Sequence, residues 1–144
     1  MIDNQIDQIV NNFSDSDWDT LGSYYNGILK NRSPFYVRYG GVRKPNGEID
    51  MPYYVENDAA SNVRRFLINK KLNIKFDWYR WRNGKAILHS NSSHKYEQID
   101  ARTVIKIFIA VLHNDRFNEG AFARLFESGS GELLLKRWIE LKPL

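Results

Sequence analysis

The chain has 144 residues, a formal net charge of +4, 42% hydrophobic and 14% aromatic residues, and no cysteine. These values predict one folded domain over residues 1–144, and they exclude disulfides, thiolate metal sites and cysteine nucleophiles. No signal peptide begins the chain and no apolar run reaches the roughly 20 residues of a membrane helix, so we expect a soluble bacterial protein of the cytoplasm.

The N-terminal part predicts two helices. Apolar residues recur at helical spacing from Ile2 to Phe13, which predicts a first helix over about residues 3–13. The acidic segment from Ser14 to Asp19 predicts the start of a second helix. Ser16 and Asp19 have the spacing of a capping box.

A β-hairpin is predicted between residues 33 and 55. Phe35, Val37 and Tyr39 alternate with polar residues, as in a half-buried strand, and the segment 51–55 forms a return strand. The tripeptide at 45–47, Pro-Asn-Gly, is a strong turn signal that places the tip of the hairpin near residue 46.

The middle of the chain predicts a helix, a short strand and a loop. The helix covers residues 56–72 and is capped by Asn57 or Asp58. Residues 73–81 read as a short strand that enters a tight aromatic segment, where arginines alternate with aromatic rings. Such a pattern either binds single-stranded nucleic acid or packs its tryptophans into the core, and we favour the second interpretation. The polar segment 85–98 predicts an exposed, mobile loop.

Three helices are predicted in the C-terminal third. The segment 100–113 is apolar almost all round and follows the N-cap residue Asp100, so it predicts the central core helix. A second helix runs from Asn118, its cap, to about residue 128, and Gly129 follows it as a left-handed C-cap. Ser130 caps a last helix that ends before Pro143. The expected fold class is therefore α+β, a mostly helical domain with one small β-hairpin or short antiparallel sheet.

Two segments carry a resemblance to a known family. Residues 77–81 have the pattern D-W-x-x-W, and residues 116–120 and 127–129 have the patterns R-F-x-x-G and E-S-G. Over about residues 76–141 the chain resembles an uncharacterised bacterial family, the domain of unknown function 6508. It departs from the family at 136–138 and in an extra glycine at 131. The resemblance implies no established activity. The residues that carry it are Asp77, Trp78, Trp81, Arg116, Phe117, Gly120, Glu127 and Gly129.

We assign these residues architectural roles. Phe117 and the two tryptophans are expected in the core, and Gly120 is expected to permit close helix packing. Arg116 and Glu127 would meet only if the turn between their helices is sharp. An enzyme with a site near these two residues remains an alternative.

No pattern of catalytic chemistry is present in the sequence. The three histidines are His89, His94 and His113, and none belongs to a metal-binding or nucleophile-activating motif. We therefore assign no catalytic residue, no metal ligand and no cofactor, and we lean against an enzyme.

The charge is distributed unevenly along the chain. Residues 1–29 carry five aspartates and no lysine or arginine, whereas residues 30–85 carry thirteen lysines and arginines against five acidic residues. The basic middle either binds a partner or faces the acidic N-terminal segment. We predict a non-enzymatic binding module, with a protein partner favoured over nucleic acid and an undetermined oligomeric state. The candidate binding residues are Arg38, Arg43, Lys44, Arg64, Arg65, Lys70, Lys71, Arg80 and Arg82.

Overall fold

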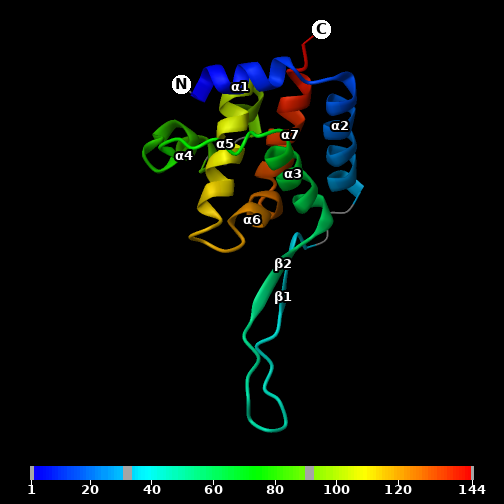
Figure 1. Ribbon diagram of the computed structural model, residues 1–144, viewed down its shortest axis with the longest axis vertical. Helices are drawn as coiled ribbons and strands as arrows, with labels where there is room; N and C mark the ends of the chain where they lie inside the picture. The colour runs from blue at the N-terminus through cyan, green and yellow to red at the C-terminus, as the bar shows by residue number, and fades with distance from the viewer. Residues whose placement is uncertain (1, 31–33, 90–92, 144) are drawn as a thin grey trace.

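A computed structural model describes residues 2–30, 34–89 and 93–143, and within this part the chain forms seven α-helices and one two-stranded antiparallel sheet. The helices form one body, and the hairpin projects from it (Figure 1). The elements are α1 (Ile2–Asn11), α2 (Asp15–Lys30), β1 (Tyr36–Tyr39), β2 (Tyr53–Glu56), α3 (Asp58–Asn69), α4 (Arg82–Leu88), α5 (Ala101–Asn114), α6 (Ala121–Glu127) and α7 (Ser130–Glu140). Short 3₁₀ helices cover Trp78–Arg80 and Ser93–Glu97. The prediction of a mostly helical α+β fold is confirmed.

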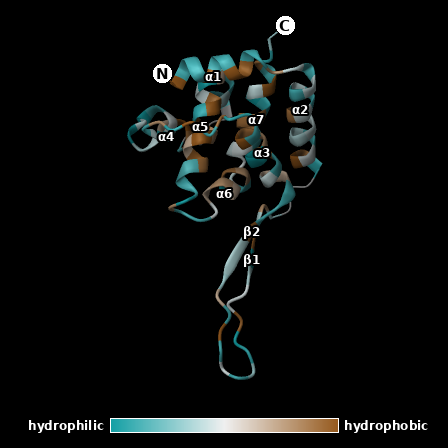
Figure 2. Ribbon diagram, viewed as in Figure 1, coloured by the Kyte–Doolittle hydropathy of each residue, from teal (hydrophilic) through white to brown (hydrophobic). Residues whose placement is uncertain are grey.

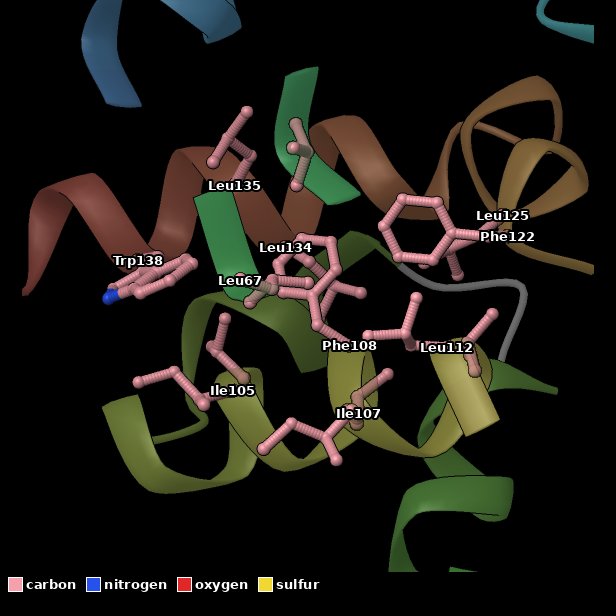
Figure 3. Close-up of a cluster of buried hydrophobic side chains, with 14 of the residues drawn as sticks. Leu67, Ile105, Ile107, Phe108, Leu112, Phe122, Leu125, Leu134, Leu135 and Trp138 are labelled. Atoms are coloured by element: carbon pink, nitrogen blue, oxygen red, sulfur yellow. The ribbon is translucent and has the colours of Figure 1, made fainter. Parts of the chain in front are cut away.

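Helix α5 is the centre of the core, as its sequence predicted. Seven of its fourteen residues are buried, and its N-terminus is capped by Asp100, whose Oδ1 accepts the Thr103 N–H at 2.8 Å. Helices α3, α6 and α7 supply the side chains that surround it (Figure 3). The Phe108 ring lies 6.0 Å from that of Trp138 and 6.4 Å from that of Phe122, so one aromatic side chain joins three helices.

Several predicted boundaries shift. The reciprocal capping box of α2 is formed by Ser14 and Asp17, two residues earlier than predicted: Asp17 Oδ2 accepts the Ser14 N–H and Ser14 Oγ accepts the Asp17 N–H. Helix α6 begins after Gly120 rather than at Asn118. Helix α7 follows Gly129, so Ser130 is its first residue and not its cap.

Two predictions for the middle of the chain are wrong. Residues 73–81 contain no strand and end in a 3₁₀ turn. The predicted loop at 85–98 begins inside α4 and ends in the second 3₁₀ turn, although residues 90–92 lie outside the described part. The second segment buries two apolar side chains, Ile87 and Tyr96, which their polar neighbours conceal in the sequence.

The acidic N-terminal segment is neutralised within the fold. Asp17 pairs with Lys70 of the basic middle, while Asp7 pairs with Arg102 and Asp3 lies 3.5 Å from the Lys106 ammonium group. The basic middle therefore faces the acidic segment at one lysine. The other partners are Arg102 and Lys106 of α5 and, for Asp15, Lys142 at 3.6 Å.

These contacts predict that the protein loses folding stability as the pH becomes acidic. The hydrogen bond from Lys70 lowers the pKa of Asp17, and that from Arg102 lowers the pKa of Asp7. A carboxylate whose pKa is lower in the folded state contributes stability that is complete above its unfolded pKa of about 3.9 and is lost as pH falls through its folded pKa. Urea titrations should show that Asp17→Asn destabilises the protein at pH 7, and that its difference from wild type disappears towards pH 2–3. A difference independent of pH would contradict the role of this ion pair.

Candidate functional site

The hairpin is a projecting arm, defined here as residues 36–56. β1 and β2 pair in antiparallel register, with Val37 opposite Val55 and Tyr39 opposite Tyr53. The arm continues past the strands to an isolated bridge between Arg43 and Ile49 and a tip where Lys44 N–H donates to Glu48 O. It points away from the helices and from both chain ends (Figure 1).

One face of the two paired strands is apolar and exposed. Residues that lie directly opposite in an antiparallel pair share a face, and alternate residues of a strand share a face. Val37, Val55, Tyr39 and Tyr53 thus lie together, with 37%, 46%, 47% and 55% of their surfaces exposed. Figure 2 shows hydrophobic colour continuing along the distal arm, where Met51 is 86% exposed. A soluble domain normally buries such a face. We call these four residues the apolar face.

The opposite face is anchored to the body through Tyr36. Its ring stacks on Tyr54 at 4.5 Å, and it lies against Gly120 at the start of α6. Gly120 has a φ of +86°, and a Cβ at this position would lie 2.2 Å from the Tyr36 ring. Burial raises the pKa of the Tyr36 hydroxyl. Only glycine therefore fits both the backbone conformation and the close contact.

A partly buried network of ion pairs anchors the end of β2. Arg64 of α3 donates from Nε to Glu56 Oε1 at 2.6 Å and from Nη2 to Asp115 Oδ2 at 2.8 Å. Asp115 also accepts the Phe122 N–H at 3.2 Å, which adds the first turn of α6. Burial alone would lower the pKa of Arg64, but its hydrogen bonds to the two carboxylates raise it. The network thus joins the arm to α3, α5 and α6.

The arm as a whole carries no excess charge. Residues 36–56 hold three lysines and arginines and three acidic residues. Lys44 pairs with Asp50 at 2.9 Å, and Glu56 pairs with Arg64. Arg38 and Arg43 form no side-chain hydrogen bond or ion pair within the described ranges. These two of the predicted binding residues are therefore available at the arm.

The remaining predicted binding residues do not gather on one surface. Arg64 is held in the network, Lys70 pairs with Asp17, and Arg65 donates to Asn62 at 2.7 Å. Lys71 lies two residues after α3 and adopts the left-handed conformation, with a φ of +58°. Arg80 lies 3.7 Å from Asp77, and Arg82 is exposed at the start of α4. The basic middle of the sequence is dispersed in the fold.

The family-motif residues have three different environments. Trp78 and Trp81 are half-buried and line a groove between α4 and α5. Phe117 was expected in the core, but 82% of its surface is exposed, because it lies in the turn after α5. Glu127 is exposed at the end of α6 and does not line the hollow that contains Arg116. Gly129, with a φ of +89°, forms the left-handed junction before α7.

Sequence reasoning missed the apolar face. It identified the hairpin and its alternating pattern, but assigned binding to the cations between the apolar residues. The signal that could have found it is the alternation itself, because Val37 and Tyr39 alternate in step with Tyr53 and Val55. Nothing in the pattern says which face meets the body.

Neither a metal-binding cluster nor a membrane-spanning helix occurs among the described residues. No group of three or more histidine, aspartate or glutamate side chains in 2–30, 34–89 and 93–143 is arranged to hold a metal ion. Across those same ranges, none of the helices combines the length and the apolarity needed to cross a bilayer.

Comparison with known proteins identifies one family. The model of a family of unknown function, DUF6508, matches residues 13–143, and this covers most of the chain. No curated protein and no solved structure matches. The chain therefore belongs to DUF6508, and the family segment includes the arm, its anchors and the tryptophan groove. The resemblance seen in the sequence is confirmed over a longer segment than residues 76–141.

A pair of glycine substitutions tests the Tyr36 anchor. Gly120→Ala should lower the free energy of unfolding by about 2–4 kcal/mol, because it adds a steric clash to the cost of positive φ. Gly129→Ala is the matched control: its φ is similar and a Cβ there meets no atom within 4 Å. It should cost only about 1–2 kcal/mol. Equal losses in urea denaturation would show that the Tyr36 contact is unimportant.

A second pair tests the ion network. Arg64→Met should lower the free energy of unfolding by about 1–3 kcal/mol, because Glu56 and Asp115 lose a charged partner in a partly desolvated place. The neighbouring Arg65→Met, on the exposed side of the same helix, should change it by no more than about 0.5 kcal/mol. Similar losses of unfolding free energy in the two variants would indicate that both substitutions act on the helix propensity of α3 and not on the ion network.

Proposed function

We propose that this member of DUF6508 is a protein-interaction module that binds its partner through the apolar face of the arm. The observation that carries this proposal is the exposure of Val37, Val55, Tyr39 and Tyr53 on a ribbon that projects from the body. Contiguous exposed apolar surface marks an interaction site in soluble proteins. Tyrosines are favoured in such surfaces because they bury a large area at a small cost in side-chain entropy.

The way the arm is held supports binding. An isolated two-stranded ribbon is marginally stable in water. Here, the Tyr36 contact and the Arg64 network fix its base, so the arm loses less freedom when it binds. Each strand has one unpaired edge in the described sheet, which offers backbone hydrogen bonds to an added strand.

The charge of the arm favours protein over nucleic acid. A ribbon that enters a nucleic-acid groove gains most of its affinity from phosphate contacts, and therefore needs an excess of lysine and arginine. This arm has equal numbers of basic and acidic residues. Arg43, which lies beyond the strands and forms no ion pair within the described residues, suits a protein partner whose apolar patch has an acidic border.

The test uses the double variant Tyr39→Thr with Tyr53→Thr. Threonine keeps strand propensity but removes both rings, so the hairpin should persist while affinity falls by about 100-fold or more. Wild type is first used to isolate, from an extract of its own organism, a protein that forms a stoichiometric complex with it. That partner is purified, and its affinity for wild type and for the double variant is measured by calorimetry. Sedimentation equilibrium of the purified chain alone tests whether the partner is a second copy of the same chain.

The control is Ile68→Thr, which removes an equally exposed apolar side chain from α3, outside the arm. It should bind like wild type. Binding should also persist at 0.5 M salt, whereas a phosphate-driven contact would weaken by orders of magnitude. Unchanged affinity of the double variant would overturn the proposal. A gel shift with nucleic acid that the double variant abolishes would replace it with a nucleic-acid function.

A further inference from the structure

We propose that the groove between α4 and α5 binds a small organic anion with a flat, largely apolar body. The groove has a volume of about 400 Å³, within the size of pockets that hold small ligands. It lies on the helical body and uses none of the residues of the arm. The proposal is therefore independent of the arm's function.

The groove has an apolar floor and an aromatic wall. Ile107, Ala110 and Val111 of α5 line it together with Leu88 of α4, and Trp78 and Trp81 flank them. Gly84 shapes the wall, because a Cβ there would lie 2.4 Å from the Trp81 ring. Only glycine lets this indole lie against the backbone of α4. The floor thus stays open instead of being filled by a side chain from residue 84.

The two indoles differ in how they are held. Trp81 packs against the core and has the Phe76 ring at 5.8 Å and the Lys106 ammonium group at 4.9 Å. Trp78 is half-buried, and it is not among the described side chains that pack against the core. It lines both the groove and a second hollow of about 330 Å³. A half-exposed indole offers a stacking surface to a flat ring.

The charge around both hollows is positive. Lys85 lines the groove beside His89, and Lys75 and Arg116 line the second hollow beside His113; the two lysines and the arginine supply the positive charge. No aspartate or glutamate is among the described residues that line either one. Asp77, which precedes Trp78, is directed to Arg80 at 3.7 Å. Unbalanced cations beside an apolar floor match an anion attached to an apolar body.

The best-placed cations are Lys75 and Arg116. Within the described part of the chain, neither side chain forms a hydrogen bond or an ion pair. His113, which lines the same hollow, is fixed by a 2.9 Å contact of its Nε2 with Ile74 O, so this nitrogen donates to the carbonyl. A ring on Trp78 can thus direct a carboxylate, sulfonate or phosphate to the guanidinium of Arg116, which binds such groups in a fork.

The geometry favours a small molecule over a single-stranded nucleic acid. A single strand needs successive stacking platforms and a continuous track of cations along its backbone. The groove supplies one half-buried indole, Trp78, and the cations Lys75 and Arg116 line the second hollow that Trp78 also lines. The chemistry that fits is one flat ring system and one anionic group, as in an aryl carboxylate or a mononucleotide.

Two dyes that differ only in their charge test this inference. 8-Anilinonaphthalene-1-sulfonate has the flat body and an anion, and N-phenyl-1-naphthylamine has the same body without the sulfonate. The affinities of wild type and variants for each dye are measured by dye fluorescence, with folding verified by circular dichroism. Trp78→Ala should lower the affinity for both dyes by about tenfold or more, which is the effect expected from one lost stacking contact.

The double variant Lys75→Ala with Arg116→Ala separates charge from shape. It should lower the affinity for the sulfonate dye by about tenfold or more and leave the affinity for the neutral dye unchanged. Charge-assisted hydrogen bonds are lost only for the anion. Lys136→Ala, an exposed lysine of α7, is the charge control and should bind both dyes like wild type. Met51→Ser controls for dye bound to the arm.

Competition identifies the source of the ligand. Displacement of the sulfonate by 1-naphthoate supports an aryl carboxylate, and displacement by adenosine monophosphate supports a mononucleotide. Failure of both to displace it would overturn the proposal. The same conclusion would follow if the double variant weakened both dyes equally, or if Met51→Ser abolished sulfonate binding while Trp78→Ala preserved it.

Discussion

The contact of Arg64 with Glu56 and Asp115 is the interaction on which the arm depends. Arg64 belongs to α3, Glu56 ends β2, and Asp115 follows α5, so a single guanidinium joins three parts of the chain. The Phe122 ring lies 5.0 Å beneath it and extends the junction to α6. The two carboxylates neutralise the guanidinium and accept three hydrogen bonds from it, which makes its partial burial tolerable. Directional contacts of this kind fix where the ribbon leaves the body.

An exposed apolar ribbon is a risk as well as a binding surface, because free strand edges invite aggregation. Several features of the arm limit this risk. Its regular strands are four residues each, and Pro45 and the Lys44–Asp50 ion pair occupy the tip. Arg38 lies on the face opposite the apolar one, beside Tyr54. The ribbon is thus short and bordered by charge, yet its apolar face stays open to a larger partner.

The elements were more predictable than the surfaces. The periodicity of α5, the cap at Asp100 and the Pro-Asn-Gly turn are local signals, and the structure confirms all three. The direction of the apolar face is not local, since it follows from the contact of Tyr36 with Gly120, 84 residues away in sequence. The sequence did not predict helix α4, because the helix is short and buries only Gly84 and Ile87, which is too few residues to form a helical pattern.

Helix α1 connects the N-terminus to the tryptophan groove, although the family match begins only at residue 13. The Lys106 ammonium group lies 3.5 Å from Asp3 of α1 and also contacts the rings of Trp81 and Phe76. A cation over an indole face is attracted by the ring electrons, and the nearby carboxylate offsets the cost of its burial. Asp3 thus helps to hold the wall of the groove from outside the matched segment. Changes in α1 can therefore alter the groove without touching a residue that lines it.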